Sequence, residues 1–335
     1  MSLPTTSSDD ADGWARSLWA CLGALGISAF LLWVAMIVID PYDSGKFGWL
    51  GIEGVDDRTT FTAAASRARN PRFDSAVIGN STAQLLEPAQ LSQATGLRFV
   101  QLYMTGARPL EELALLDFFL RNHPRVGALV FVTDPSWCVH RASEPDGGFP
   151  YWLYGDSSIK YAVRLLSRQS VEHAFQRLSI GFGLRERNDP TGYFSYEDIW
   201  PPGTFNEVNR PRDPPPAATA AERDMLPEVA RLDAAVKKLP ADIGVVLLVP
   251  PTFYTVIAQP GTPAGLDREA CNAALKRIVA GRPNSNFINY RVDNAMTRDI
   301  ANFADFIHYR SNVARKIGED IAASLRLGGA AKIDF

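Results

Sequence analysis

An uncharged run near the N-terminus, Ser17 to Ile39, constrains this chain more than any other feature. Its sequence is SLWACLGALGISAFLLWVAMIVI. As a helix, this run would extend about 35 Å, which is enough to cross the hydrocarbon core of a bilayer with some tilt. The sequence therefore predicts a transmembrane anchor over 17–39, preceded by an N-terminal tail over 1–16.

Two other interpretations of the run are weaker. A signal peptide has an apolar region of roughly 7–15 residues that ends at a small-residue cleavage site, whereas this run is longer and continues into DPYDSG. A buried helix of a soluble protein rarely stays uncharged over such a length. The distribution of positive charge does not decide the topology, because Arg16 precedes the run and Lys46 and Arg58 follow it.

The composition is that of a globular protein. The chain has 335 residues, 46% of them apolar and 21% charged, and a net charge of -3. This length can form one large domain or two modest ones. No basic stripe is present, so nucleic acid is not expected as a partner. Cys21, Cys138 and Cys271 are too few for a disulfide scaffold and have no zinc-ligand spacing, so we expect no metal or cofactor.

Strands and helices alternate after a connector at 40–72. Continuous apolar strands that alternate with helices are typical of a parallel sheet covered on both faces. The sequence therefore predicts an α/β domain over 73–335. The expected strands are 73–80, 97–104, 126–134, 241–251 and 285–291, and the expected helices are 81–96, 109–124, 266–281 and 311–329.

A long insertion at about 135–218 interrupts this alternation. It is predicted to hold two helices, in which His173 is expected to be solvated, and then an aromatic, proline-rich stretch. It is too long for a connector, so we expect a functional cap. Aromatic side chains there could face sugar rings or could equally pack the insertion's own core. These residues are Trp137, Tyr151, Trp152, Tyr154 and Trp200.

A candidate nucleophile follows the first predicted strand. In VIGNSTAQLL, residues 77–86, Ser81 lies where the strand turns into a helix. This turn would project the hydroxyl above the sheet edge, beside free backbone N–H groups that could bind an oxyanion. Taken alone, Ser81 would more often be only an N-cap.

The segment ADFIHYR, residues 304–310, supplies a matching acid and base. Asp305 precedes His308 by three residues, so its carboxylate can accept the Nδ1–H of the imidazole and leave Nε2 as a base. Because both motifs follow strands of one parallel sheet, we expect them at the same edge. The α/β-hydrolase fold is an alternative, since GNSTA is close to G-x-S-x-G, but an Asp three residues before a His fits that fold less well.

With these motifs the chain resembles the SGNH (GDSL-like) hydrolase superfamily over roughly 73–134 and 241–327. More narrowly, it resembles the membrane-anchored branch that includes the alginate O-acetylation proteins and the teichoic-acid D-alanine transfer protein. IGNS matches the first family block, LYMTGARP the second and ADFIHYR the last. The resemblance implies a flavodoxin-like three-layer α/β/α SGNH-type domain with about five parallel strands, preceded by one transmembrane helix.

The resemblance also implies roles for residues. Ser81 would be the nucleophile, His308 the base and Asp305 the orienting acid, and the N–H groups of Ser81 and Gly106 would bind the oxyanion. Asn80 stands where the family motif has Asp, and VFVTDPSW stands where the family expects Gly-x-Asn-Asp. A carboxylate at that position cannot donate to an oxyanion, and losing one such donor typically costs ~10²–10³ in rate. Further residues that could contact substrate are Asn80, Asp134, Trp137, Tyr309 and Arg310.

The function implied is a serine O-acyltransferase or O-acyl esterase that acts on an envelope or secreted polysaccharide. The protein would be a single-pass protein of the inner (plasma) membrane with its domain on the extracytoplasmic or periplasmic side, and a multi-span membrane acyltransferase could be its partner. A non-catalytic glycan-binding or scaffold subunit that retains the fold is the alternative. On the extracytoplasmic side Cys138 and Cys271 could pair, although two free thiols are the commoner outcome.

Overall fold

The computed structural model describes residues 8–55, 60–186, 188–208 and 218–326. The chain divides into two compact units. One comprises Met1–Val55 with Asp156–Glu186, and the other comprises Asp56–Gly155 with Arg187–Phe335. The predicted tail at 1–16 and the end of the predicted helix at 311–329 lie partly outside the described residues.

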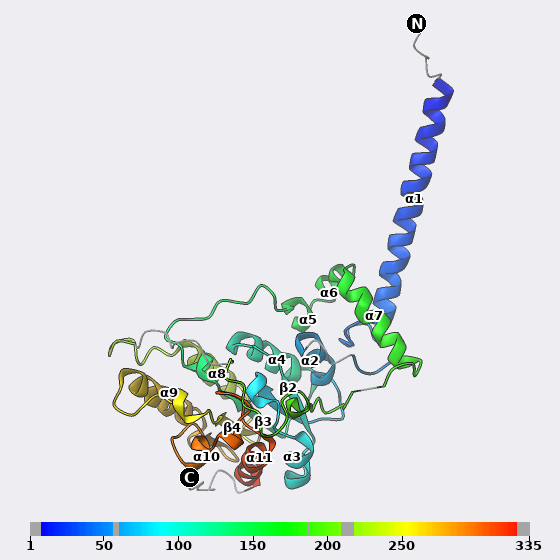
Figure 1. The fold of residues 1–335 in the computed structure, drawn as a ribbon. Helices are drawn as coiled ribbons and strands as arrows, with labels where there is room; N and C mark the ends of the chain where they lie inside the picture. Colours follow the sequence, from blue (N-terminus) through cyan, green and yellow to red (C-terminus); the bar gives the residue numbers. More distant parts are fainter. Residues whose placement is uncertain (1–7, 56–59, 187, 209–217, 327–335) are drawn as a thin grey trace. The chain divides into compact units, whose positions relative to one another are not determined.

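The first unit is built on one long apolar helix, α1 (Ser8–Ile39). Its stretch Gly13–Ile39 is long and apolar enough to cross a membrane, and most of this surface is exposed rather than packed against the protein. The predicted apolar helix is therefore confirmed. Two further helices, α6 (Ser158–Arg164) and α7 (Arg168–Gly181), lie beside the C-terminal end of α1 (Figure 1).

The second unit contains a parallel sheet of five strands in the order β2-β1-β3-β4-β5. This is the flavodoxin-like order, and it confirms the predicted α/β fold. Each strand is shorter at its ends than the apolar run that predicted it. The strands are β1 (Ser75–Gly79), β2 (Phe99–Tyr103), β3 (Ala128–Val132), β4 (Gly244–Val249) and β5 (Asn286–Asn289).

Helices cover both faces of this sheet. On one face α3 (Pro88–Thr95) packs against α11 (Ser311–Arg326), and both contact strands. The other face carries α2, α4, α8 and α9 (Figure 1). Every residue of β1 to β4 is therefore buried, as their continuous apolar runs predict. The bounds of these four helices are α2 (Thr60–Ala68), α4 (Pro109–Asn122), α8 (Pro227–Lys237) and α9 (Pro263–Val279).

Proline opens four of the helices, because its fixed φ suits the first turn and its missing N–H has no partner there anyway. Pro88, Pro109, Pro227 and Pro263 each occupy this position. Pro88 also explains a difference from the prediction of one helix over 81–96. A residue before proline disfavours the helical region, and Glu87 is extended, so the segment divides into a 3-10 turn and α3.

Short elements occupy the connections. The helices are α5 (Tyr151–Tyr154) and α10 (Ala295–Arg298). The 3-10 turns are η1 (Ser81–Ala83), η2 (Pro135–Cys138), η3 (Tyr196–Asp198), η4 (Tyr254–Val256) and η5 (Ile300–Asn302).

A disulfide joins η2 to α9. Cys138 and Cys271 are bonded, with their Cα atoms 5.6 Å apart, across 133 residues of sequence. Cys138 and Cys271 therefore pair, as the sequence allowed, and are not two free thiols. Cys21, in α1, is free.

The predicted insertion at 135–218 contributes to both units. Residues 156–186 belong with α1, whereas residues 188–208 belong with the sheet. The prediction that His173 is solvated is wrong. Its ring is buried and lies 5.0 Å from the ring of Tyr42, centroid to centroid, because α7 turns this face toward the end of α1.

Candidate active site

Ser81, His308 and Asp305 form one hydrogen-bonded row in the sheet unit. The Nε2 atom of His308 lies 2.9 Å from the Ser81 hydroxyl, and Nδ1 lies 2.7 Å from a carboxylate oxygen of Asp305. Ser81 directly follows β1, and the other two residues lie in the loop between η5 and α11. The structure therefore brings together the two motifs that lie 227 residues apart in sequence.

The Asp305 carboxylate is held by its own loop. Its second oxygen accepts the backbone N–H groups of Ile307 and His308, each at 2.8 Å. The side chain is fully buried. A carboxylate fixed in this way accepts the Nδ1–H of the imidazole, which leaves Nε2 as the acceptor for the Ser81 hydroxyl.

The turn that carries Ser81 depends on the two residues before it. A Cβ atom on Gly79 would lie 2.9 Å from Cβ of Val132 and 3.0 Å from Cβ of Ala83, so only glycine fits there. Asn80 then caps η1, because its side-chain oxygen accepts the N–H of Thr82 at 3.1 Å. The alternative that Ser81 is the N-cap is therefore wrong. Asn80 does the capping, and the Ser81 hydroxyl bonds to His308 instead.

Two backbone N–H groups at this edge of the sheet are the candidates for binding an oxyanion. Within the described residues, neither the N–H of Ser81 nor that of Gly106 donates to a protein acceptor. Ser81 follows β1 and Gly106 follows β2, and these strands are neighbours with Gly79 paired to Tyr103. Gly106 has φ +73, a left-handed backbone that favours glycine. The two residues assigned to the oxyanion thus follow adjacent strands at one edge.

Asn80 and Asp134, the two residues that differ from the motifs that the chain resembles, bind one another. The Nδ2 of Asn80 donates to a carboxylate oxygen of Asp134 at 2.6 Å. The other oxygen of Asp134 accepts the backbone N–H of Ser136 at 2.9 Å. Asp134 therefore acts as an acceptor that ties the end of β3 to the end of β1, and it supplies no third donor for an oxyanion.

Two aromatic rings from residues 188–208 lie against His308. The ring centroids of Tyr196 and Trp200 are 5.6 Å and 6.0 Å from that of His308. Tyr196 is buried, whereas Trp200 is partly exposed and is the aromatic candidate best placed to meet a substrate. Tyr196 was not predicted from the sequence, where its place in an aromatic stretch is the only signal.

Tyr309 and Arg310 bond to the backbone around the site, and their side chains are not accessible to a substrate. Both are buried. The Tyr309 hydroxyl donates to the backbone carbonyl of Thr82 at 2.6 Å. The Arg310 guanidinium donates to the backbone carbonyls of Trp200 and Thr204. The prediction of substrate contacts for these two residues is corrected to a positioning role.

Trp137 is also unavailable to a substrate. Its side chain is fully buried, because η2 turns the indole toward α4, where Nε1 donates to the carboxylate of Glu112 at 3.3 Å. Burial, together with the nearby charge of Asp134, raises the pKa of Glu112 well above its usual range. The aromatic candidates Tyr151, Trp152 and Tyr154 belong to α5 and its surroundings, and Tyr154 is buried.

The remaining histidines lie outside the hydrogen-bonded row. His123 follows α4, and its Nδ1 lies 2.9 Å from the backbone carbonyl of Phe119, as a residue at a helix C-terminus would. His140 contacts the backbone carbonyl of Met225. Across the described part of the chain, no group of three or more His, Cys, Asp or Glu side chains could hold a metal ion.

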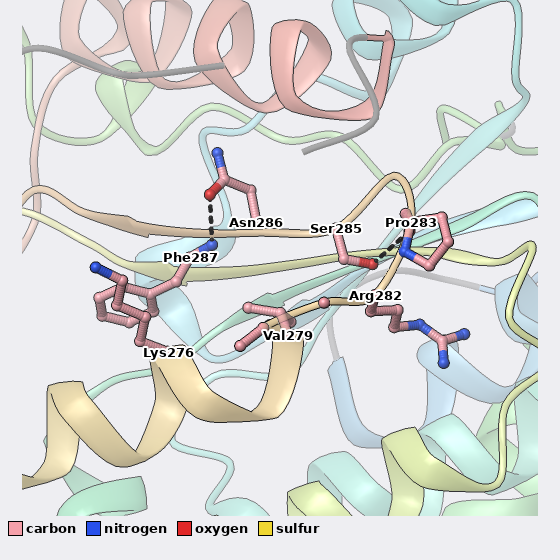
Figure 2. A pocket seen from close by; sticks show the side chains of 9 residues that line it. Lys276, Val279, Arg282, Pro283, Ser285, Asn286 and Phe287 are labelled. Carbon is pink, nitrogen blue, oxygen red and sulfur yellow. Dashed lines mark hydrogen bonds between the residues drawn. The ribbon is translucent and has the colours of Figure 1, made fainter. Parts of the chain in front are cut away.

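A hollow at the opposite edge of the sheet has no comparable chemistry. Figure 2 shows it at the start of β5 and the end of α9, lined by residues that include Lys276, Arg282 and Phe287. The Arg282 guanidinium already donates to backbone carbonyls, Ile243 among them. Ligands in open parallel sheets bind beyond the carboxyl ends of the strands, so the edge that carries Ser81 is the stronger candidate.

Comparison with known proteins adds no assignment. The chain matches no model of a known protein family, and it matches no curated protein. The candidate site therefore depends on its own geometry and on the resemblance of its motifs.

Proposed function

We propose that this protein is a membrane-anchored, extracytoplasmic serine O-acyltransferase or O-acyl esterase of the SGNH type that acts on an envelope or secreted polysaccharide. The observation that carries the proposal is the row from Ser81 through His308 to Asp305, with distances of 2.9 and 2.7 Å. A hydroxyl, an imidazole and a buried carboxylate in this order are the parts of a serine acyl-transfer site.

The first half of the reaction forms an acyl-enzyme. The Ser81 oxygen attacks the acyl carbonyl while its proton passes to Nε2 of His308, and the carbonyl oxygen becomes an oxyanion facing the N–H groups of Ser81 and Gly106. When the intermediate collapses, the bond to the leaving oxygen breaks, and His308 returns the proton to that oxygen.

The second half releases the acyl group. His308 takes a proton from an incoming hydroxyl, whose oxygen attacks the acyl carbon, and then returns the proton to Ser81. A sugar hydroxyl as acceptor makes the protein a transferase, and water makes it an esterase. Asp305 stays ionised and stabilises the imidazolium in both halves.

The proposed compartment is supported by two observations. The helix α1 could cross a membrane once, and the disulfide between Cys138 and Cys271 is of a kind that persists in oxidising compartments. Mass spectrometry of the mature protein tests whether the anchor is retained. Peptides from α1 are expected, and a mature N-terminus after Ile39 would identify a cleaved signal sequence instead.

A second function is favoured by one specific observation. Asp134 accepts hydrogen bonds from Asn80 and Ser136 and offers no oxyanion donor, which suits a non-catalytic subunit that binds a glycan within a polysaccharide-modification complex. A multi-span membrane acyltransferase would then do the chemistry.

A fluorophosphonate probe distinguishes the two functions. The purified full-length protein in detergent is treated with the probe, and the modified peptide is identified by mass spectrometry. The catalytic proposal expects modification of Ser81 that is lost in Ser81→Ala and His308→Ala and retained in Ser158→Ala, at an exposed serine of α6. An unmodified Ser81 in folded protein would favour the non-catalytic subunit.

A further inference from the structure

The helices α6 and α7 carry apolar side chains that point away from their own unit. In and just after α6, Ile159, Val163 and Leu166 are between 52% and 78% exposed. In and just after α7, Val171, Phe175 and Phe182 are between 41% and 75% exposed. Soluble surfaces rarely gather large apolar residues in this way, and such patches mark contacts with proteins or membranes.

The spacing places two of these side chains on one face of each helix. Ile159 and Val163 lie four residues apart in α6, and Val171 and Phe175 lie four residues apart in α7, so each pair shares a helical face and forms an apolar stripe. Leu166 and Phe182 follow the ends of the two helices and are exposed as well. A different face of each helix packs inward, which leaves the stripe as a second apolar surface. The inward residues are Tyr161, Ala162, Leu165, His173, Ala174, Arg177 and Ile180.

Buried polar contacts fix both helices to the end of α1. The indole Nε1 of Trp33 donates to the backbone carbonyl of Ala162 at 2.8 Å. The guanidinium of Arg177 donates to the carbonyl of Ile39 at 3.0 Å and to the carboxylate of Asp43 at 2.7 Å. The hydroxyl of Tyr161 donates to the carboxylate of Asp40. The stripes are therefore held at a defined level along α1.

That level falls within the apolar part of α1. Trp33 precedes Ile39 by six residues, or about 9 Å along the helix axis. The hydrocarbon core of a bilayer needs about 20 helical residues, and the uncharged run that begins after Arg16 supplies them by about Met36. Ala162 and α6 would thus lie beside the last turns of the span, near the boundary between headgroups and acyl chains. The helix α7, bonded to Ile39, would lie about 4.5 Å further along the axis, on the headgroup side of that boundary.

We propose that α6 and α7 lie in the interface of the same bilayer that α1 crosses, with their apolar stripes inserted among the lipids. The inference rests on the proposed anchorage of α1. Lys160 and Arg164 are exposed beside the stripe, whereas Arg168 forms an ion pair with Glu172. Basic side chains on the polar face of an amphipathic helix pair with lipid phosphates. A protein partner could also cover apolar residues, but the level set by Trp33 and these basic side chains favour lipid.

Site-directed spin labels test the proposal in the full-length chain. The background variant is Cys21→Ser, which removes the free thiol, and the disulfide is left oxidised. Labels at Val163→Cys and Phe175→Cys are measured in nanodiscs of phosphatidylcholine and phosphatidylglycerol by their collision rates with oxygen and with a nickel chelate. Lipid-inserted positions are expected to give a high ratio of oxygen to nickel collisions.

Matched controls lie on the same helices. Ser158→Cys on α6 and Gln169→Cys on α7 are at exposed polar positions and should give low ratios. Leu25→Cys reports on α1 itself and should give a high ratio whether or not α6 and α7 meet lipid. Circular dichroism confirms that each labelled protein is folded.

Each other outcome contradicts the inference in a distinct way. If Val163 and Phe175 give nickel-accessible labels while Leu25 gives a lipid-exposed one, the anchorage stands and the interfacial placement is wrong. If the label at Leu25 is itself nickel-accessible, the anchorage fails and the placement fails with it. If Val163 and Phe175 are shielded from both reagents in native membranes but nickel-accessible in nanodiscs, a protein partner covers the stripes instead of lipid.

Discussion

The hydroxyl of Tyr309 donates a hydrogen bond to the backbone carbonyl of Thr82, 2.6 Å away. This bond links the residue after His308 to the residue after Ser81, and so it joins the two segments of the candidate active site directly. Burial raises the pKa of Tyr309 above its ordinary value, so the phenol keeps its proton and remains a donor across the neutral range.

Tyr309→Phe should loosen the contact between Ser81 and His308. The variant leaves the buried carbonyl of Thr82 without this donor, which should lower the free energy of unfolding by about 1–3 kcal/mol. We expect kcat for an ester substrate to fall about tenfold with little change in KM. A tenfold fall corresponds to an increase of about 1.4 kcal/mol in the activation free energy. Tyr290→Phe is the matched control, because its hydroxyl bonds to Asp320 on α11. It should lower stability without changing kcat.

Ser81→Ala and His308→Ala should each reduce ester turnover by about 10⁶-fold, and the double variant should be no worse than the poorer single variant. Residues that act as a unit are not additive. The measurement is hydrolysis of an aryl acetate by the full-length protein, with thermal unfolding as the control for fold. Losses that multiply in the double variant would mean that the two side chains act independently.

Asp305→Asn should reduce turnover less than Ser81→Ala does, by about 10²–10⁴-fold. The asparagine oxygen can still accept the N–H groups of Ile307 and His308, so the loop should keep its conformation. Its amide nitrogen would then face Nδ1 of His308 and drive the ring proton to Nε2, where it blocks acceptance of the Ser81 proton. Nitrogen-15 spectra of the imidazole should show this change of tautomer. An unchanged tautomer would mean that Asp305 does not orient the ring.

Glu112→Gln should stabilise the protein, and by more at higher pH. Burial raises the pKa of Glu112 in the folded protein. Between the ordinary pKa of a glutamate and this raised pKa, Glu112 is therefore protonated in the folded protein and ionised in the unfolded chain. The wild-type stability from this group is therefore full at low pH and is lost as the pH rises toward the folded pKa, by about 1.4 kcal/mol per pH unit.

Urea unfolding at pH 5 and pH 8 measures this difference. The advantage of Glu112→Gln over the wild type should grow between the two values. An advantage that is the same at both pH values would mean that Glu112 is ionised in the folded protein.

Replacing Cys138 and Cys271 by serine should lower the free energy of unfolding by about 2–5 kcal/mol. The disulfide closes a loop of 133 residues, and cross-links of long loops restrict the unfolded chain most. Unfolding in urea with and without a reductant measures the effect. The wild type should lose stability on reduction, whereas the double serine variant should not respond.

Local patterns were enough to predict the outline of the fold. An uncharged run of this length is helical whatever surrounds it, and continuous apolar strands between helices lead to a covered parallel sheet. The pairing of Ser81 with Asp305 and His308 was also predictable, because all follow strands and the carboxyl ends of parallel strands meet at one edge.

Burial and partner choice required the tertiary structure. Trp137, Tyr309 and His173 have the same local signals as exposed aromatic and polar residues, yet each is buried by an element distant in sequence. Asn80 rather than Ser81 caps η1. Its amide nitrogen donates to the Asp134 carboxylate, and its amide oxygen accepts the N–H of Thr82.

The placement of residues 156–186 with α1 shows the same division. The sequence by itself determined that Ser17–Ile39 forms an apolar helix, since composition and length act locally. That α6 and α7 pack against its end depends on Arg177 reaching Asp43, 134 residues away. Such a contact produces no periodic pattern in the sequence. It forms because a charge buried between packed helices is stable only when an opposite charge or a hydrogen-bonding group lies beside it.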